Sequence, residues 1–280
     1  MKHGVVIFPT DKAIQPVELA QLAEDRGFES LWFPEHSHIP ASRLTPWGGR
    51  LDAEDLPEQY WRLHDQFVAL AAAAAATSTI KLGTGITLVA QRDPFWLAKQ
   101  VASLDVISNG RFIFGVGFGW NVEEAEDHGI NFKKRHRIVD EMLTAMKLIW
   151  TQDEPEFHGE FVDFDPMWAW PKPVQKPHPP IVFGTGTGPL GTKAVIAHAD
   201  GWMPLRLSRS YEEEIAAMRT AFTVAGRDPD ELEITIFYAK PDRDLLDEFR
   251  NLGVARAIFS LPPAGREVVI PKLDELAALS

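Results

Sequence analysis

The stretch IVFGTGTGPLGTKAV (residues 181–195) joins a short apolar run to a segment of helical period through a glycine-rich turn. Its core, GTGPLG (186–191), spells G-x-G-x-x-G, the fingerprint of dinucleotide-binding turns. Such a turn needs an acidic residue about 20 residues further on, at the end of the next strand, to bind a ribose. The next apolar run, GWMPLRL, contains no acidic residue. The stretch therefore reads better as one strand–turn–helix unit of a longer repeat.

That repeat runs through the whole chain. Eight short apolar runs, each followed by a longer segment of helical period, occur along the 280 residues. The expected strands are 4–9, 30–36, 80–88, 111–119, 180–186, 201–207, 232–239 and 255–262. They are continuous apolar runs, which is typical of parallel strands buried on both faces. Eight such units predict an α/β fold, a (β/α)8 TIM barrel that spans residues 1–280 as a single domain.

Two segments interrupt the repeat. Residues 37–63, after strand two, form a long polar loop, and residues 156–180, before strand five, read as a small hairpin followed by a proline-rich approach. In a TIM barrel the active site lies where strands end and the following loops begin. The first insertion is therefore expected on the active face, and the second on the opposite side with a structural role.

Composition limits the kinds of partner. The formal net charge is −12 and no block of Lys and Arg stands out, so nucleic acid and anionic membranes are disfavoured and a small-molecule ligand is favoured. The chain has no cysteine, which excludes disulfides, thiolate metal sites and a thiol nucleophile. No apolar segment is long enough to span a bilayer, and no secretion signal is evident. These features predict a cytoplasmic protein.

Two apparent motifs are better explained as ordinary structure. His36 and His38 mimic the H-x-H pair of metal-dependent barrel hydrolases, but such a site needs further ligands from other strand ends. Strands five, six and eight end in FGTG, PLRL and SLPP, which offer none, so no metal is expected. Lys240, in YAKPD, is most simply a solvated loop lysine and not a Schiff-base lysine.

The expected strand ends combine one ionisable pair, Glu35 and His36, with three glycine-rich turns. Glycine allows the backbone to approach a flat cofactor closely, so this combination suits a cofactor-binding site. In order they read FPEH, then LGTGITLVAQRDPFWLAKQVASLDVISNGRFIFGVGFGWNVEE, then RIVDEMLTAMKLIW, then PKPVQKPHPPIVFGTG and ADGWMP. This order resembles the luciferase-like monooxygenase superfamily, and more narrowly its branch that uses the deazaflavin coenzyme F420. The resemblance runs from the first strand to about Pro204.

The resemblance implies roles for the residues at strand ends two and three. In the family, strand three ends in a bulge with a non-prolyl cis peptide behind the cofactor ring, which here falls at Gly85 and Ile86. The family's Asp-His pair at the end of strand two matches Glu35 and His36. His36 would then exchange a proton beside the reactive ring as a hydride moves, with Glu35 as its catalytic neighbour.

The resemblance also implies where the rest of the cofactor lies. Gly119, Trp120 and Asn121 match the loop along the ring edge and tail. The turn after strand five matches the phosphate-binding turn, where backbone N–H groups at a helix N-terminus hold an anion without a basic side chain. Its residues are Gly184, Thr185, Gly186, Thr187 and Gly188.

These implications predict an F420-dependent oxidoreductase that transfers a hydride between the deazaflavin and a small organic substrate. Two alternatives stay open: an FMN-dependent monooxygenase, because both cofactors suit the same bed, and a barrel that binds its cofactor without turnover. Trp47, Tyr60 and Trp61 in the first insertion could form an apolar wall for the substrate. Trp47 and Trp61, with Arg206 after strand six, are candidate substrate contacts. The family also implies a homodimer.

Overall fold

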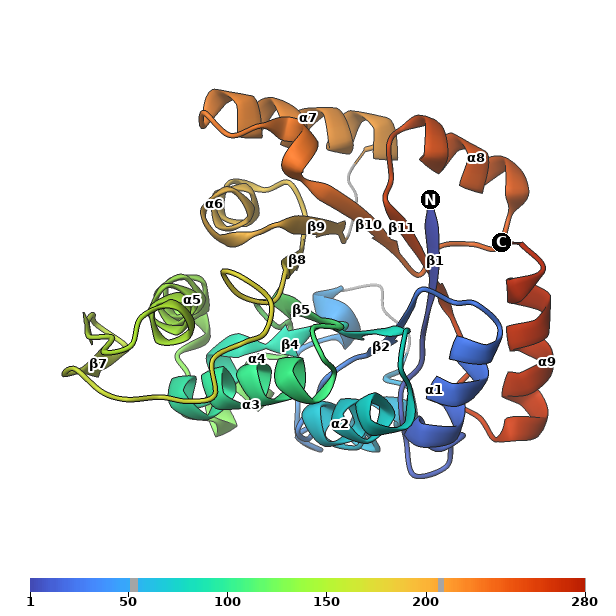
Figure 1. Cartoon of the computed structure of the whole chain (residues 1–280), viewed down its shortest axis with the longest axis horizontal. Helices are drawn as coiled ribbons and strands as arrows, with labels where there is room; N and C mark the ends of the chain where they lie inside the picture. The colour runs from blue at the N-terminus through green and yellow to red at the C-terminus, as the bar shows by residue number, and fades with distance from the viewer. Residues whose placement is uncertain (51–54, 206–208, 280) are drawn as a thin grey trace.

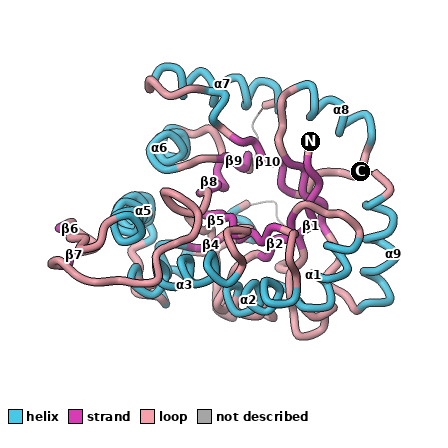
Figure 2. The backbone as a smooth tube through the Cα atoms, in the orientation of Figure 1, coloured by secondary structure: helices cyan, strands magenta, loops and turns pink. Residues whose placement is uncertain are grey.

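The chain folds around one closed ring of parallel strands. The computed structural model describes residues 1–50, 55–205 and 209–279, and its central strands are surrounded by helices (Figures 1 and 2). The strand segments of the ring are β1 (Lys2–Val6), β2 (Ser30–Phe33), β3 (Lys81–Thr84), β4 (Thr87–Leu88), β5 (Phe112–Gly117), β8 (Ile181–Thr185), β9 (Gly201–Pro204), β10 (Glu233–Phe237) and β11 (Arg256–Ser260).

The ring closes with eight strand positions, as predicted. The strands follow the order β3-β2-β1-β11-β10-β9-β8-β5-β4, all pairings are parallel, and a further pairing of β3 with β5 completes the circle. The segments β3 and β4 share one position, because the peptide bond between Gly85 and Ile86 is cis and interrupts a single strand there. The predicted cis bond and the predicted TIM barrel are both confirmed.

Helices cover the outside of the ring (Figure 1). A helix follows each strand of the ring, as the repeat predicted, and an additional short helix, α4, lies between β5 and α5. The helices are α1 (Pro16–Asp25), α2 (Gln66–Ala76), α3 (Pro94–Ile107), α4 (Val122–Asp127), α5 (Arg135–Thr151), α6 (Pro189–His198), α7 (Tyr211–Val224), α8 (Arg243–Asn251) and α9 (Arg266–Ala277). Residues on one face of each strand pack against these helices and form the larger of two hydrophobic clusters.

The second cluster fills the inside of the barrel. It contains Val6, Trp32, Ile113, Val182, Met203, Phe237 and Ile258, which come from seven different strands. Trp32 is fully buried, and its indole Nε1 donates a hydrogen bond to Ser30 Oγ at 2.8 Å. A Cβ at Gly83 would lie 2.2 Å from the Trp32 ring. The barrel is therefore plugged by side chains below its active face, as in other small parallel barrels.

The insertion before strand five has the predicted form. Strands β6 (Phe157–His158) and β7 (Asp163–Phe164) pair antiparallel, and they lie beyond α5 at the edge of the molecule (Figures 1 and 2). Within the described residues, no helix combines the length and the apolar character needed to cross a bilayer.

Candidate active site

A cavity of about 890 Å³ is lined by residues from the carboxyl ends of β2, β3, β5, β8, β9 and β10. This volume lies in the usual range for small-molecule and cofactor sites. Ten of the residues singled out from the sequence line it together: Glu35, His36, Tyr60, Gly85, Ile86, Gly119, Trp120, Gly184, Thr185 and Gly186. The first insertion also contributes Thr45, Pro46 and Tyr60, which places it at the active face as expected.

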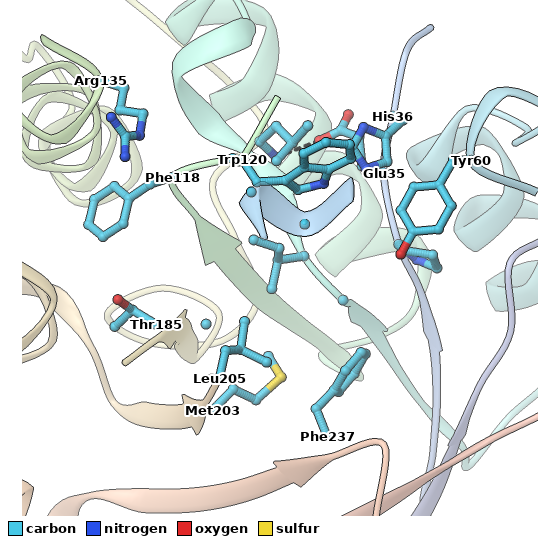
Figure 3. A pocket seen from close by; sticks show the side chains of 18 of the residues that line it. Glu35, His36, Tyr60, Phe118, Trp120, Arg135, Thr185, Met203, Leu205 and Phe237 are labelled. Atoms are coloured by element: carbon cyan, nitrogen blue, oxygen red, sulfur yellow. Dashed lines mark hydrogen bonds between the residues drawn. The ribbon is translucent and has the colours of Figure 1, made fainter. Parts of the chain in front are cut away.

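The cavity has two chemically different ends (Figure 3). Arg135, Phe118 and Thr185 gather at one side, and His36, Trp120 and Tyr60 gather at the other. We call the first group, together with Gly184, Gly186 and His136, the basic end, and the second group, together with Phe8 and Tyr238, the aromatic end.

His36 lies at the aromatic end with its imidazole held by a carboxylate. Its Nδ1 is 2.8 Å from Oε2 of Glu124, in α4. The other carboxylate oxygen of Glu124 accepts the backbone N–H of Ser37 at 3.3 Å. Because Nδ1 faces Glu124, Nε2 is the nitrogen that is available to a ligand in the cavity. This is the arrangement that a proton-exchanging histidine needs.

Glu35 is held by the segment that follows the cis bond. Its Oε2 accepts the backbone N–H of Leu88 at 2.6 Å, and its Oε1 accepts the N–H of Arg92 Nε at 2.6 Å. Glu124, and not Glu35, is the carboxylate that lies within hydrogen-bond distance of His36. The catalytic role that the resemblance implies for Glu35 stays a prediction.

Ile86 lies between two glycine-bearing strands at the floor of the cavity. A Cβ at Gly117 would lie 1.8 Å from Cδ1 of Ile86, and a Cβ at Gly184 would lie 2.9 Å from its Cγ2. Gly117 ends β5 and Gly184 lies in β8. The two glycines therefore leave the space that the Ile86 side chain occupies, and Gly184 contributes to packing as well as to the cavity wall.

The basic end contains a cation that sequence reasoning missed. The Arg135 guanidinium lies 3.8 Å from the centre of the Phe132 ring and donates through Nη1 to the Phe132 carbonyl at 2.8 Å. Its Nε is buried without a hydrogen-bond partner. Burial and the neighbouring Arg135 lower the pKa of His136, so His136 is neutral at pH 7. The anion site was expected without a basic side chain, and Arg135 adds a cation to the lining at this end of the cavity.

One signal could have revealed this cation. Lys133, Lys134, Arg135 and Arg137 form a basic run at the start of the long helix α5. Positive charge is unfavourable at a helix N-terminus because the helix dipole is positive there. A basic run in that position therefore does not serve helix stability, and it is explained if the run binds an anionic ligand.

The other sequence candidates lie outside the lining. Asn121 is buried as the N-cap of α4, and its side chain accepts the backbone N–H of Glu124. Thr187 donates to the buried Glu214, and Gly188 is the N-cap residue of α6. Trp47 packs edge-on against Tyr60, with ring centres 5.8 Å apart, so it supports the aromatic end from behind.

The last two candidate substrate contacts from the sequence are Trp61 and Arg206. Trp61 is 49% exposed and does not line the cavity, although it directly follows Tyr60, which does. Arg206 lies outside the described residues. Of the three aromatic residues that the sequence singled out in the insertion, Tyr60 lines the cavity, whereas Trp47 and Trp61 do not.

The family is shown by comparison with known proteins. A sequence model described as luciferase-like monooxygenase matches residues 9–240 of the chain. The match covers most of the barrel and all three glycine-rich strand ends. The chain therefore belongs to the luciferase-like monooxygenase family, and an enzyme of the oxidoreductase and monooxygenase class is supported.

The most similar curated relatives include two cofactor types. The chain is 39% identical to an uncharacterized protein of Mycobacterium tuberculosis, over 99% of this chain and 98% of the relative. It is 28% identical to the F420-dependent hydroxymycolic acid dehydrogenase of M. tuberculosis, over 81% of this chain and 59% of the relative. It is 36% identical to the FMNH(2)-dependent dimethylsulfone monooxygenase of Pseudomonas putida, over 60% of this chain and 42% of the relative.

Solved structures support the fold. The monooxygenase RslO1 from Streptomyces bottropensis is similar with a TM-score of 0.78 and 23% identity, over 99% of this chain and 98% of that one. The coenzyme F420 dependent tetrahydromethanopterin reductase from Methanopyrus kandleri is similar with a TM-score of 0.74 and 19% identity, over 99% of this chain and 97% of that one. At these identities the likeness concerns the barrel and not the reaction.

Proposed function

We propose that this protein is an F420-dependent oxidoreductase that transfers a hydride between the deazaflavin and a small organic substrate, with His36 exchanging the accompanying proton. The observation that carries the proposal is the placement of His36. Its imidazole lines the same cavity as the cis Gly85–Ile86 floor and the basic end, and Glu124 holds its Nδ1.

The residues present fit an anionic tricyclic cofactor. The Arg135 Nε is buried and has no partner among the described residues, and it lines the cavity together with Gly184, Thr185 and Gly186. A phosphate there would accept from this guanidinium and from backbone N–H groups beside the start of α6. Ile86 and the Gly85 backbone would support the ring from below.

Each side chain then has a separable task. When bound, the deazaflavin accepts or donates a hydride in a two-electron step. His36 holds or receives a proton at Nε2, and Glu124 keeps the imidazole in the orientation that presents this nitrogen. Arg135 fixes the anionic tail at the far end of the cavity. Glu35 and Arg92 hold the β4 segment that follows the floor.

FMN is the alternative cofactor, because relatives of this chain include both F420-dependent and FMNH(2)-dependent enzymes. Flavin would allow oxygen activation, whereas deazaflavin restricts the enzyme to hydride transfer. We prefer F420 because the segment from GFGWN to RIVDEM most resembles the deazaflavin branch.

A binding titration separates the candidates. Apoprotein is titrated with F420 and with FMN, and cofactor fluorescence or absorbance is followed. We expect micromolar or tighter binding of F420 and weaker binding of FMN; FMN binding without any response to F420 would replace our cofactor assignment. His36→Ala should bind cofactor normally but lose at least a hundredfold in turnover, and unchanged turnover would show that His36 is not the proton carrier.

A further inference from the structure

Two of the three tyrosines in the chain meet at the aromatic end. Tyr60 and Tyr238 both line the cavity, whereas Tyr211 packs against Phe249 in the helical layer. Tyr238 directly follows β10 and has a φ of +59°. A left-handed backbone is uncommon for an aromatic residue and is found most often where function requires it. The first residue after a barrel strand is also where substrate contacts are usually found.

Tyr238 lines the cavity and is also partly open to solvent, with 46% of its surface exposed. Its ring is edge-on to Phe237, with ring centres 4.7 Å apart. Desolvation by the surrounding protein raises the pKa of the Tyr238 phenol despite this exposure, and the nearby Tyr60 raises it further. Burial likewise raises the pKa of Tyr60, which the Trp47 side chain partly offsets. Both phenols are therefore protonated donors at neutral pH.

Within residues 1–50, 55–205 and 209–279, the ionisable side chains that line this end already have ionic partners. Among the described residues that line it, Glu35 is engaged with Arg92 and Leu88, and His36 is engaged with Glu124. Arg135 lies at the opposite end of the cavity (Figure 3). A charged substrate group would lose its hydration here without gaining a counter-ion, which is strongly unfavourable.

The remaining surface is apolar. Phe8 packs on Tyr60 with ring centres 4.8 Å apart, and Met203, Leu205 and Phe237 lie along the lower wall (Figure 3). A substrate seated against these side chains buries hydrocarbon, while His36 and the two phenols offer polar groups to its oxygen.

We propose that Tyr60 and Tyr238 bind the oxygen of a neutral, largely apolar substrate that carries a hydroxyl or carbonyl group. This inference rests on the function proposed above and names its substrate class. In the oxidative direction the carbinol C–H bond breaks and its hydride passes to the oxidised deazaflavin, the O–H proton passes to Nε2 of His36, and a carbonyl compound remains. The reverse sequence reduces the carbonyl compound. The phenols donate hydrogen bonds to the substrate oxygen in both directions.

A matched pair of probes tests the assignment. The protein is loaded with whichever of F420 and FMN it binds, and titrated by calorimetry with 4-phenylbutan-2-one and with 3-phenylpropanoate, which replaces the methyl ketone by a carboxylate of similar shape. We expect the ketone to bind at least tenfold more tightly than the carboxylate. Tyr238→Phe and Tyr60→Phe should each weaken ketone binding about fivefold and leave cofactor affinity unchanged. Tyr211→Phe is the matched control and should change neither.

The outcomes separate this inference from the proposed function. Equal or tighter binding of the carboxylate, or unchanged ketone affinity in both phenylalanine variants, overturns the substrate assignment while cofactor binding stands. Failure to bind either cofactor overturns the proposed function itself. Thermal melting of each variant shows whether it is folded, and a loss of ketone affinity counts only in a folded variant that binds cofactor.

Discussion

Nδ1 of His36 lies 2.8 Å from Oε2 of Glu124, although the two residues are 88 positions apart in the chain. His36 lies shortly after β2, and Glu124 lies in α4 after β5. The side chains are 6% and 0% exposed, respectively. Because an ionised carboxylate can only accept hydrogen bonds, Nδ1 carries the hydrogen and Nε2 is left with its lone pair. Glu124 is thus a positioning residue for the imidazole.

Glu124→Gln tests this relationship. A glutamine has one accepting oxygen, whereas the Glu124 carboxylate accepts from both His36 and the Ser37 N–H. In the variant, the side-chain NH₂ of the glutamine must therefore face one of these two donors, and that hydrogen bond is lost. We expect the fraction of His36 in the Nδ1–H tautomer to fall, as measured by ¹⁵N NMR of the imidazole, and turnover to fall at least tenfold with unchanged cofactor affinity.

The matched control for that variant is Glu126→Gln, an exposed position in the same helix. It should leave both the tautomer and turnover as in the wild type. An unchanged His36 tautomer in Glu124→Gln would show that Glu124 serves only to hold the loop at Ser37.

The sequence predicted those parts of the site that depend on local pattern. The strand count gave the barrel, and the resemblance to the luciferase-like family placed the cis bond at Gly85–Ile86. Glu124 and Tyr238 were missed because their roles depend on packing between distant segments and on a backbone angle that no residue type dictates. The partner of Glu35 was not predicted, because its carboxylate reaches forward to Arg92, 57 positions away.

Arg135→Gln is expected to weaken the binding of phosphorylated cofactor about tenfold or more, because a charged hydrogen bond at a partly buried site is lost. The phosphate-free compound should bind variant and wild type equally: riboflavin is compared with FMN, or the bare deazaflavin chromophore with F420, by fluorescence titration. Arg137→Gln is the control, since Arg137 is exposed and pairs with Glu160. If Arg135→Gln weakens the binding of the phosphorylated and the phosphate-free compound equally, Arg135 shapes the cavity and does not bind phosphate.

Gly117→Val is expected to remove cofactor binding altogether. The Cβ alone would overlap Cδ1 of Ile86 at 1.8 Å, so Ile86 must move into the space above the floor. Riboflavin and FMN should lose affinity to the same extent, unlike in Arg135→Gln. Gly188→Ala is the tolerated counterpart, because no atom lies within 4 Å of its Cβ and its φ is −63°. Normal binding by Gly117→Val would place the ring elsewhere.

The homodimer implied by the family stays a prediction, and α3 offers a way to test it. Trp96 is 70% exposed and Ile107 is 54% exposed on this helix. Exposed apolar side chains mark a contact surface where they form one contiguous patch, and we propose that these two belong to such a patch. We expect light scattering after gel filtration to give a dimer for the wild type and a monomer for Trp96→Glu. A monomeric wild type would remove the basis for this expectation.

Acid should release the first insertion from α4 before the barrel unfolds. Glu123 Oε1 accepts the N–H of Leu44 at 2.7 Å and that of Thr45 at 3.1 Å. Burial opposes ionisation of Glu123, but hydrogen bonds from Thr45 and Leu44 prevail and lower its pKa from 4.5 to about 2. A lowered pKa means that the contact is at full strength above about pH 4.5 and is lost as the pH falls toward 2.

Hydrogen exchange at Leu44 and Thr45, corrected for the intrinsic rate, should therefore accelerate as the pH falls from about 4.5 toward 2. In Glu123→Gln, protection should be lower at pH 7 and independent of pH over the same range. If the wild-type protection does not change between pH 5 and pH 2.5, the Glu123 carboxylate does not hold the loop.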